Sequence, residues 1–113
     1  MADCLFCKMV TKEIPTTIVY EDEDILAFKD IAPKAPVHIL LIPKKHITAL
    51  QAAQPEDAAV LGKIQIIANQ LAKEFGIAES GYRLLTNSGA DAGQEVFHIH
   101  YHLVGGKKLA DIC

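Results

Sequence analysis

The sequence has no excess of positive charge and no long hydrophobic run. Its 113 residues carry a formal net charge of −3, which argues against a broad electrostatic grip on DNA or RNA but still allows a local pocket for a small anion. The longest apolar segment, around VHILLIP at 37–43, falls far short of the roughly 20 residues that span a membrane. We therefore expect no nucleic acid polymer and no membrane among the partners.

The sequence also lacks the marks of an exported protein. The first ten residues, MADCLFCKMV, contain neither a basic n-region nor a long apolar stretch, so they do not resemble a signal peptide. We expect a cytoplasmic protein, and in that reducing compartment its three cysteines are thiols or metal ligands rather than disulfides. With no internal repeat and room for one modest core, residues 1–113 are expected to form a single domain.

Hydrophobic periodicity predicts one long helix. Apolar residues recur at steps of three and four, on one stripe made of Val60, Ile64, Ile67, Leu71 and Phe75. Pro55 suits the start of this helix and Gly76 its end, so we place it at 55–76. A shorter helical segment is expected within residues 1–13.

Strands are predicted on both sides of this helix. Segments rich in β-branched and aromatic residues, bounded by turn residues, lie at 17–22, 24–30, 37–43, 81–87 and 95–104. The first two are close enough to form a hairpin. An α+β fold accounts best for this order: an antiparallel sheet of about five strands, packed on one face by the long helix.

The segment FHIHYHLVGG, at 97–106, places three of the five histidines at alternate positions. Side chains alternate between the two faces of a strand, so His98, His100 and His102 are expected on one face. The apolar and aromatic residues between them are then expected on the opposite face, under the long helix. Polar residues such as histidine are uncommon in buried strands, so this pattern needs a physical reason.

Three interpretations of the triplet follow from the residues alone. The histidines could be unrelated polar residues on a solvated face, although such faces favour Thr, Lys and Glu. All three are too widely spaced along a strand to converge on one ion, but two of them with a third ligand elsewhere could form a catalytic zinc site. The third interpretation is phosphate chemistry. An imidazole whose Nδ1–H is bound to a backbone carbonyl would offer Nε2 as a neutral nucleophile. The glycine-bearing loop NSGADAGQE, just upstream, would bring backbone N–H groups toward the same phosphate.

The triplet resembles the signature of the histidine triad (HIT) superfamily. HIHYHLV fits the pattern H-φ-H-φ-H-φ-φ, in which φ is hydrophobic. The likeness extends to FKDIAPKAPVHILLIPKKHI at 28–47, to YRLLTNSGADAGQEVFHIHYHLVGG at 82–106 and to EIP near the start, so it covers nearly the whole chain. The chain is most similar to the nucleotide-binding, nucleoside phosphoramidase branch, and this implies a HIT-like fold.

The resemblance implies a role for each catalytic histidine. His100 matches the residue that attacks the α-phosphorus and forms a covalent nucleotidyl-histidine, which water then hydrolyses. His102 matches a residue that contacts the phosphate, and His38 matches an additional active-site histidine on a neighbouring strand. In this family the chemistry needs no metal. From the residues alone, His38 is also compatible with a hydrogen-bonded core histidine.

The resemblance also assigns residues to the nucleotide. Besides His100 and His102, the positions that match contacts to ribose, base, phosphate and leaving group are Asp30, Ile31, Asn87, Gly93, Gln94 and Glu95. Asp30 and Gly93 also suit ordinary turns. Glu95 departs from the pattern, because some relatives carry a serine there that hydrogen-bonds the leaving group, and an ionised carboxylate cannot donate. Only its backbone N–H is carried over, so the leaving-group preference stays open.

A second motif, Cys4-x-x-Cys7, forms half of a metal site. Redox pairs of this spacing usually follow a strand, and nothing upstream can form one; plain thiols are a further alternative. The resemblance to zinc-containing relatives implies a structural zinc ion held by Cys4, Cys7, His46 and His98. That assignment uses His98 for the metal and leaves His100 free to attack. No role is inferred for Cys113.

The expected activity is hydrolysis of purine nucleoside 5′-phosphoramidates, with adenosine preferred. The resemblance also implies a homodimer whose two sheets join into one. A dinucleoside polyphosphate hydrolase of the same superfamily is one alternative, and a nucleotide-binding or protein-interaction module with incidental catalysis is another. The set of His38, His100, His102 and Asn87 favours an enzyme, because binding alone does not require a free imidazole nucleophile.

Overall fold

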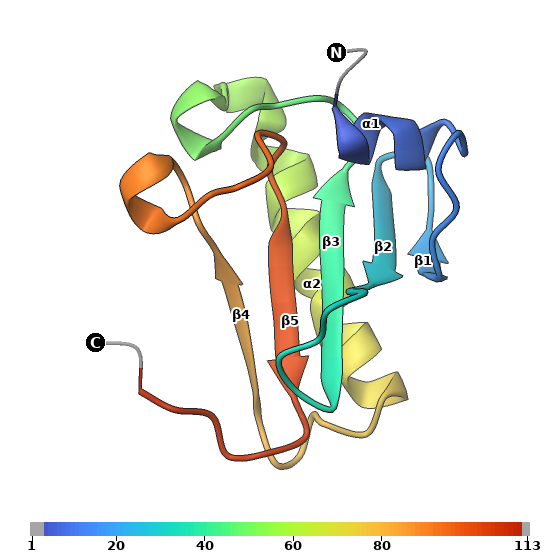
Figure 1. Cartoon of the computed structure of the whole chain (residues 1–113), viewed down its shortest axis with the longest axis vertical. Coiled ribbons are helices and arrows are strands. Elements are labelled where there is room, and N and C mark those ends of the chain that lie inside the picture. The colour runs from blue at the N-terminus through green and yellow to red at the C-terminus, as the bar shows by residue number, and fades with distance from the viewer. Residues whose placement is uncertain (1–3, 112–113) are drawn as a thin grey trace.

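The hydrophobic segments with β-branched residues form the strands of one antiparallel sheet (Figure 1). The computed structural model describes residues 4–111; Cys113 lies outside them. The sheet has the order β1-β2-β3-β5-β4, with β1 (Ile18–Glu21), β2 (Ile25–Lys29), β3 (Val37–Pro43), β4 (Tyr82–Thr86) and β5 (Tyr101–Gly105). The predicted fold class, an antiparallel sheet with one long helix and a short N-terminal helix, is confirmed.

The long helix forms where the apolar stripe predicts it. A 3-10 turn at Pro55–Asp57 leads into α2 (Ala58–Glu74). Proline suits this position because the N–H groups in the first turn of a helix have no intrahelical partner, so its missing N–H costs no hydrogen bond. Gly76 ends the helix with a φ of 74°, and the Ile77 N–H then reaches back to the Ala72 carbonyl at 2.9 Å. Glycine adopts this left-handed conformation without strain. No helix within residues 4–111 is both long and apolar enough to cross a membrane.

The two faces of the sheet have different contents. On one face, α2 packs against a cluster of buried strand residues that includes Ile25, Ile39, Leu41 and Leu103. On the opposite face, α1 (Leu5–Val10) covers a smaller apolar cluster made of Phe6, Leu26, Phe28, Leu40 and Ile42. Figure 1 shows α2 behind the sheet and α1 at the upper ends of β2 and β3. The long helix thus stabilises the sheet from one side and leaves much of the other side for polar residues.

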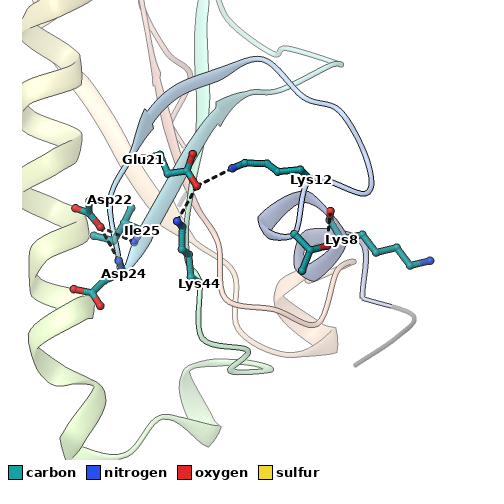
Figure 2. A network of polar contacts seen from close by, with 8 residues as sticks. Lys8, Lys12, Glu21, Asp22, Asp24, Ile25 and Lys44 are labelled. Carbon is teal, nitrogen blue, oxygen red and sulfur yellow. Dashed lines mark hydrogen bonds and ion pairs between the residues drawn. The ribbon is translucent and has the colours of Figure 1, made fainter.

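Ionic contacts hold the β1 edge of the sheet to the segment after α1 (Figure 2). Glu21, at the end of β1, accepts hydrogen bonds from the ammonium groups of Lys12 and Lys44, both at 2.7 Å. These two contacts hold the pKa of Glu21 below its usual value. In the turn that follows, an oxygen of Asp22 accepts the backbone N–H of Asp24 at 2.8 Å. The β1–β2 hairpin predicted from the sequence is therefore closed by its own acidic turn residues.

The last predicted strand is wrong in its first half. We expected a strand over 95–104, but β5 begins only at Tyr101, so the only histidine of the triplet within it is His102. Before β5 the backbone bonds to a different neighbour, because the Ile99 N–H donates to the carbonyl of Ile47, in the loop after β3, at 2.7 Å. The three histidines therefore do not share one strand face. The other four strands lie within their predicted ranges.

Candidate active site and candidate metal centre

The face of the sheet away from α2 is hollowed by a cavity of about 560 Å³. Strands β3, β4 and β5 contribute to it, together with α1 and the loop that follows the 3-10 turn at Ala90–Ala92. Predicted site residues that line the cavity are Asp30, His38, Asn87, Gly93, Glu95, His100 and His102. The fold thus gathers around one space residues that are far apart in the sequence.

His38 and His102 meet across neighbouring strands. His102 pairs in register with Leu40, so His38 is its diagonal neighbour on the same face. The His38 Nε2 lies 2.9 Å from the His102 Nδ1, and the backbone N–H of Lys34 donates to the His38 Nδ1 at 3.0 Å. Because the His38 Nδ1 accepts, the proton of this ring is on Nε2 and is donated to His102. The proton of His102 is then on its own Nε2, which remains a donor.

Burial keeps both of these rings neutral. It lowers the pKa of His102 to about 4, an effect to which His100 and His38 add and which Asp30 partly offsets. It also lowers the pKa of His38, with Asp30 at 3.4 Å acting in the opposite direction. Asp30, His38 and His102 lie close enough together to hold an ion. Since the facing ring nitrogens already share a proton, we assign no metal there.

His100 has the geometry of a nucleophile. Its Nδ1 lies 2.8 Å from the carbonyl oxygen of His98, and because a carbonyl only accepts, the ring proton is on Nδ1. The Nε2 then keeps its lone pair, the form required for attack on phosphorus. Phe6 packs edge-on against the ring with 5.0 Å between centroids, and His102 lies at 5.2 Å. One hydrogen bond and two aromatic contacts therefore fix this ring.

The predicted metal ligands meet in one cluster, formed by Cys4, Cys7, His46 and His98. Their ligand atoms all lie within 4.8 Å of one another. The Cys4 Sγ is 3.4 Å from the His98 Nδ1, and the Cys7 Sγ is 3.2 Å from the His46 Nδ1. A tetrahedral zinc ion, with bonds of about 2.3 Å to sulfur and 2.0–2.1 Å to nitrogen, would hold sulfur and nitrogen about 3.6 Å apart. The cluster has the donor set and the spacing that a metal ion needs.

Two further features suit this cluster to a cation. The His98 Nε2 donates to the carbonyl of Pro43 at 2.7 Å, so its Nδ1 lone pair faces the thiols. Burial and the adjacent Cys4 raise the pKa of Cys7 to about 11, so a thiolate there requires a compensating positive charge. A bound metal ion supplies that charge and displaces the thiol protons.

The group of Cys4, Cys7, His46 and His98, here called the cysteine–histidine cluster, adjoins the cavity at Phe6. This residue lies in α1 between the two cysteines, and its ring packs edge-on against both His98, at 5.9 Å, and His100, at 5.0 Å. The Cys4 Sγ also caps α1 by accepting the Cys7 N–H at 3.3 Å. Because Phe6 lines the cavity, the position of α1 shapes one of its walls.

Two predicted nucleotide contacts lie outside the cavity lining. Ile31 has a side chain that is 96% exposed. Gln94 is buried and holds the loop: its Oε1 accepts the Gly89 N–H at 2.8 Å, and its Nε2 donates to the carbonyls of Thr48 and Val96 at 2.7 and 3.1 Å. All the polar groups of the Gln94 side chain are therefore engaged within the protein, where they shape the loop.

Sequence reasoning missed several residues that line the cavity, namely Phe6, Lys34, Leu40, Arg83, Leu85, Val104 and Leu109. Arg83 and Leu85 share a strand face by their spacing of two. That this face is the cavity face follows only from the pairing of Leu85 with His102. The position of Phe6 between two candidate metal ligands could have indicated that this residue lies near the site. Lys34 and Leu109 lie in irregular segments whose sequence shows no pattern.

The sequence of this chain is similar to those of known proteins. A family model described as HIT domain matches residues 11–109. A purine nucleoside phosphoramidase of Escherichia coli (strain K12) is 45% identical over 107 residues, which cover 95% of this chain and 90% of that protein. An uncharacterized HIT-like protein of Synechocystis is 51% identical over 108 residues, which cover 96% and 94%.

Solved structures share its fold. A HIT family hydrolase from Legionella pneumophila Philadelphia 1 superposes with a TM-score of 0.93 at 50% identity, covering 96% of each chain. A histidine triad protein from Clostridium difficile gives a TM-score of 0.95 at 46% identity, covering 99% of this chain and 97% of that one. With the family model matching most of the sequence and relatives of 45–51% identity covering nearly all of it, the chain belongs to the HIT family.

Proposed function

We propose that the protein hydrolyses purine nucleoside 5′-phosphoramidates, with adenosine preferred, through a covalent nucleotidyl-histidine. The observation that carries the proposal is the His100 imidazole, whose Nδ1–H is bound to a backbone carbonyl so that Nε2 is left as a free base at the cavity. A module that only binds nucleotides has no use for such a group. The name of the relative from Escherichia coli, at 45% identity, supports the same substrate class.

The reaction proceeds by two displacements at phosphorus. In the first, the Nε2 lone pair of His100 forms a bond to the α-phosphorus, the bond from phosphorus to the leaving nitrogen breaks, and that nitrogen takes a proton from solvent. In the second, water attacks the phosphorus, the electron pair of the histidyl bond returns to Nε2, and a proton returns to solvent. The His98 carbonyl holds the Nδ1 proton throughout and stabilises the positive charge that the ring acquires in the intermediate.

The remaining residues bind and orient the nucleotide. His102 donates from Nε2 to a phosphate oxygen, and His38 fixes the tautomer in which it can do so. The other proposed contacts are those to the nucleoside, from Asp30 and Ile31, and those to the phosphate and leaving group, from Asn87, Gly93 and the backbone N–H of Glu95. Gln94, whose polar groups are engaged within the protein, serves this part of the site by holding the loop in shape. The N–H groups of Gly93 and Gln94 donate to the carbonyls of Ala90 and Gly89 at 3.0 and 3.2 Å. The left-handed φ of 86° at Gly93 therefore shapes the loop that carries Glu95 to the cavity.

We propose zinc as the ion of the cysteine and histidine cluster, with a structural role. A complete set of four protein ligands leaves no open position for substrate, which is typical of structural zinc sites. The ion would join α1 to the loop after β3 and to the segment before β5. A cytoplasmic location suits the site, since a reducing compartment keeps both thiols available.

We further propose that the single domain works as a homodimer whose two sheets join at β4. The sheet has two edge strands, β1 and β4. The register of β1 is broken between Ile18 and Tyr20, while β4 pairs without interruption. Irregular edges resist pairing with another strand, so the regular edge is the better candidate. Light scattering after size exclusion measures the mass; a monomer over the working concentration range contradicts the dimer.

The proposed activity is tested by comparing turnover of adenosine 5′-phosphoramidate with turnover of a diadenosine polyphosphate. We expect a higher kcat/KM for the phosphoramidate, and a nucleotidyl adduct on His100 when the reaction is stopped by denaturant and the peptides are weighed. A higher kcat/KM for the dinucleotide assigns the protein to the polyphosphate hydrolases of the superfamily. Nucleotide binding without turnover or adduct assigns it to the binding modules.

A further inference from the structure

A smaller hollow lined by cations lies beside the cavity. This hollow has a volume of about 260 Å³, lies between the start of β4 and the segment after β5, and includes Arg83, Lys107 and Lys108 in its lining. Arg83 and Leu109 line both spaces, so the hollow adjoins the cavity. Arg83 is the only arginine of the sequence.

No acid among the described residues is paired with these cations. Within residues 4–111, no carboxylate forms an ion pair with Arg83, Lys107 or Lys108, and no acidic residue lines the hollow. The guanidinium of Arg83 donates one N–H, from Nη1 to the carbonyl of Ala110 at 2.9 Å. This contact holds the segment after β5 against the cavity and leaves the other N–H groups of the fork for a ligand.

The strand order tells which part of a substrate meets these cations. Asp30 follows β2, His102 lies on β5 and Arg83 lies on β4, so they succeed one another across the sheet. His102 pairs with Leu85, which makes Arg83 its diagonal neighbour, roughly 7–8 Å away. A nucleoside held near Asp30, with its phosphorus at the catalytic histidines, therefore directs its leaving group toward β4.

We propose that Arg83, Lys107 and Lys108 form an anion subsite for the leaving group, so that preferred substrates carry a negative charge on that side. The inference rests on the proposed function, which places the phosphorus. The anion is a carboxylate, as on the amine of an amino acid, or a further phosphate group. Guanidinium binds both in a bidentate manner, and the two flexible ammonium groups adapt to either.

The acidic residues of the cavity lie elsewhere. Asp30 is on the β2 side, and Glu95 is in the loop before β5, whereas Lys107 follows the other end of that strand. Charge in the cavity is therefore divided along β5. Lys34→Gln provides a matched control, because it also removes a positive charge from the cavity lining but in the loop after β2, on the side of Asp30.

The test uses two substrates that differ only in charge, the adenosine 5′-phosphoramidates of glycine and of glycinamide. In the wild-type protein at low salt we expect kcat/KM to be about two- to fivefold higher for the glycine compound, as is usual for a partly exposed charge pair. This ratio should fall with added salt. Arg83→Gln should bring the ratio close to one, Arg83→Lys should retain part of it, and Lys34→Gln should leave it near the wild-type value.

Diadenosine triphosphate separates the two sources of the anion. A kcat/KM for this compound that falls with Arg83→Gln, without a glycine preference, identifies the anion as phosphate. The proposal is overturned if two results occur together. The first is a kcat/KM for the glycinamide compound that equals or exceeds that for the glycine compound. The second is that neither Arg83→Gln nor the double variant Lys107→Gln, Lys108→Gln changes kcat/KM for either anionic substrate.

Failure of the proposed function is recognised separately. If no compound is turned over, the dissociation constants of the intact glycine and glycinamide compounds are compared instead. Tighter binding of the glycine compound that Arg83→Gln abolishes supports the subsite in the absence of catalysis. Equal binding of the two compounds overturns it.

Discussion

Two histidines of the short segment from His98 to His102 are held in different tautomers and so serve different functions. His98 donates from Nε2 to the carbonyl of Pro43, which leaves Nδ1 facing the thiols. His100 donates from Nδ1 to the carbonyl of His98, which leaves Nε2 free at the cavity. The difference teaches that the backbone partner, rather than the residue type, decides which imidazole nitrogen acts.

The two regions are also connected. The carbonyl that orients His100 belongs to His98, a member of the cysteine–histidine cluster, and the ring of Phe6 packs against both histidines. If the regions had separate functions, a change in one would leave the measured property of the other intact. The following experiments separate catalysis from metal binding and then examine their connection.

His100→Ala should have the largest effect. Removal of the nucleophile should lower kcat/KM by a factor on the order of 10³ to 10⁶ and abolish the nucleotidyl adduct. Metal content, measured by elemental analysis, should stay at the wild-type level, because the His100 ring is not among the ligands. Unchanged turnover would refute the assignment of His100.

The double change Cys4→Ser, Cys7→Ser should act mainly on stability. We expect loss of the metal, a decrease of several kcal/mol in the free energy of unfolding, and a melting temperature lower by roughly 10 °C or more. Turnover should fall far less than with His100→Ala. Cys113→Ser is the matched control, and it should change neither property. A double variant that keeps its metal and melts normally contradicts the zinc proposal.

Acid should lower the free energy of unfolding through the protonation of His102. The pKa of His102 is about 4 in the folded protein and 6.5 as its ordinary value, so between these values the unfolded chain binds a proton that the folded chain does not. The free energy of unfolding therefore falls as the pH decreases from about 6.5 to about 4, by at most about 3 kcal/mol and by less where solvent screens the ring. Denaturant unfolding at pH 7.5 and 4.5 measures this loss. It should be smaller in His102→Gln, and an equal loss in both proteins excludes His102 as its source.

Phe6→Leu should have the smallest effect, but it tests the connection directly. It removes the aromatic edge from both histidines while keeping an apolar side chain, so we expect a destabilisation of about 1 kcal/mol and a several-fold decrease in kcat with metal retained. Phe97→Leu is the matched control, because Phe97 is 52% exposed. If the two variants have the same kcat, the contact through Phe6 does not connect the cysteine–histidine cluster to the activity of His100.

Periodicity predicts much of this fold because it reports burial. The stripe of α2 and the strands beneath it are specified by which side chains avoid water, and their positions follow. The half-wrong strand before Tyr101 shows the limit. The alternation of polar and apolar residues there shows that alternate side chains have different surroundings. It does not show which backbone they pair with, and the Ile99 N–H bonds to Ile47 instead of to a neighbouring strand of the sheet.

The candidate site was predictable to a different extent in each part. The meeting of His38 with His102, and of the cysteines with His46 and His98, follows from the family resemblance. The tautomers of these rings do not, because they depend on carbonyl and N–H groups that only the chain path brings near. Arg83 was beyond prediction for a similar reason, since its relation to His102 is set by strand register.

The division of the sheet into one face under α2 and one face with the cavity has a consequence for how the protein can change. A substitution such as Ile64→Val beneath the long helix alters stability by about 0.5–1.5 kcal/mol and reaches no residue of the cavity lining. A substitution at Leu85 or Val104 reshapes the cavity while the packing under α2 stays the same. Adaptation to temperature and adaptation to a new leaving group therefore draw on separate sets of positions, and one can proceed without undoing the other.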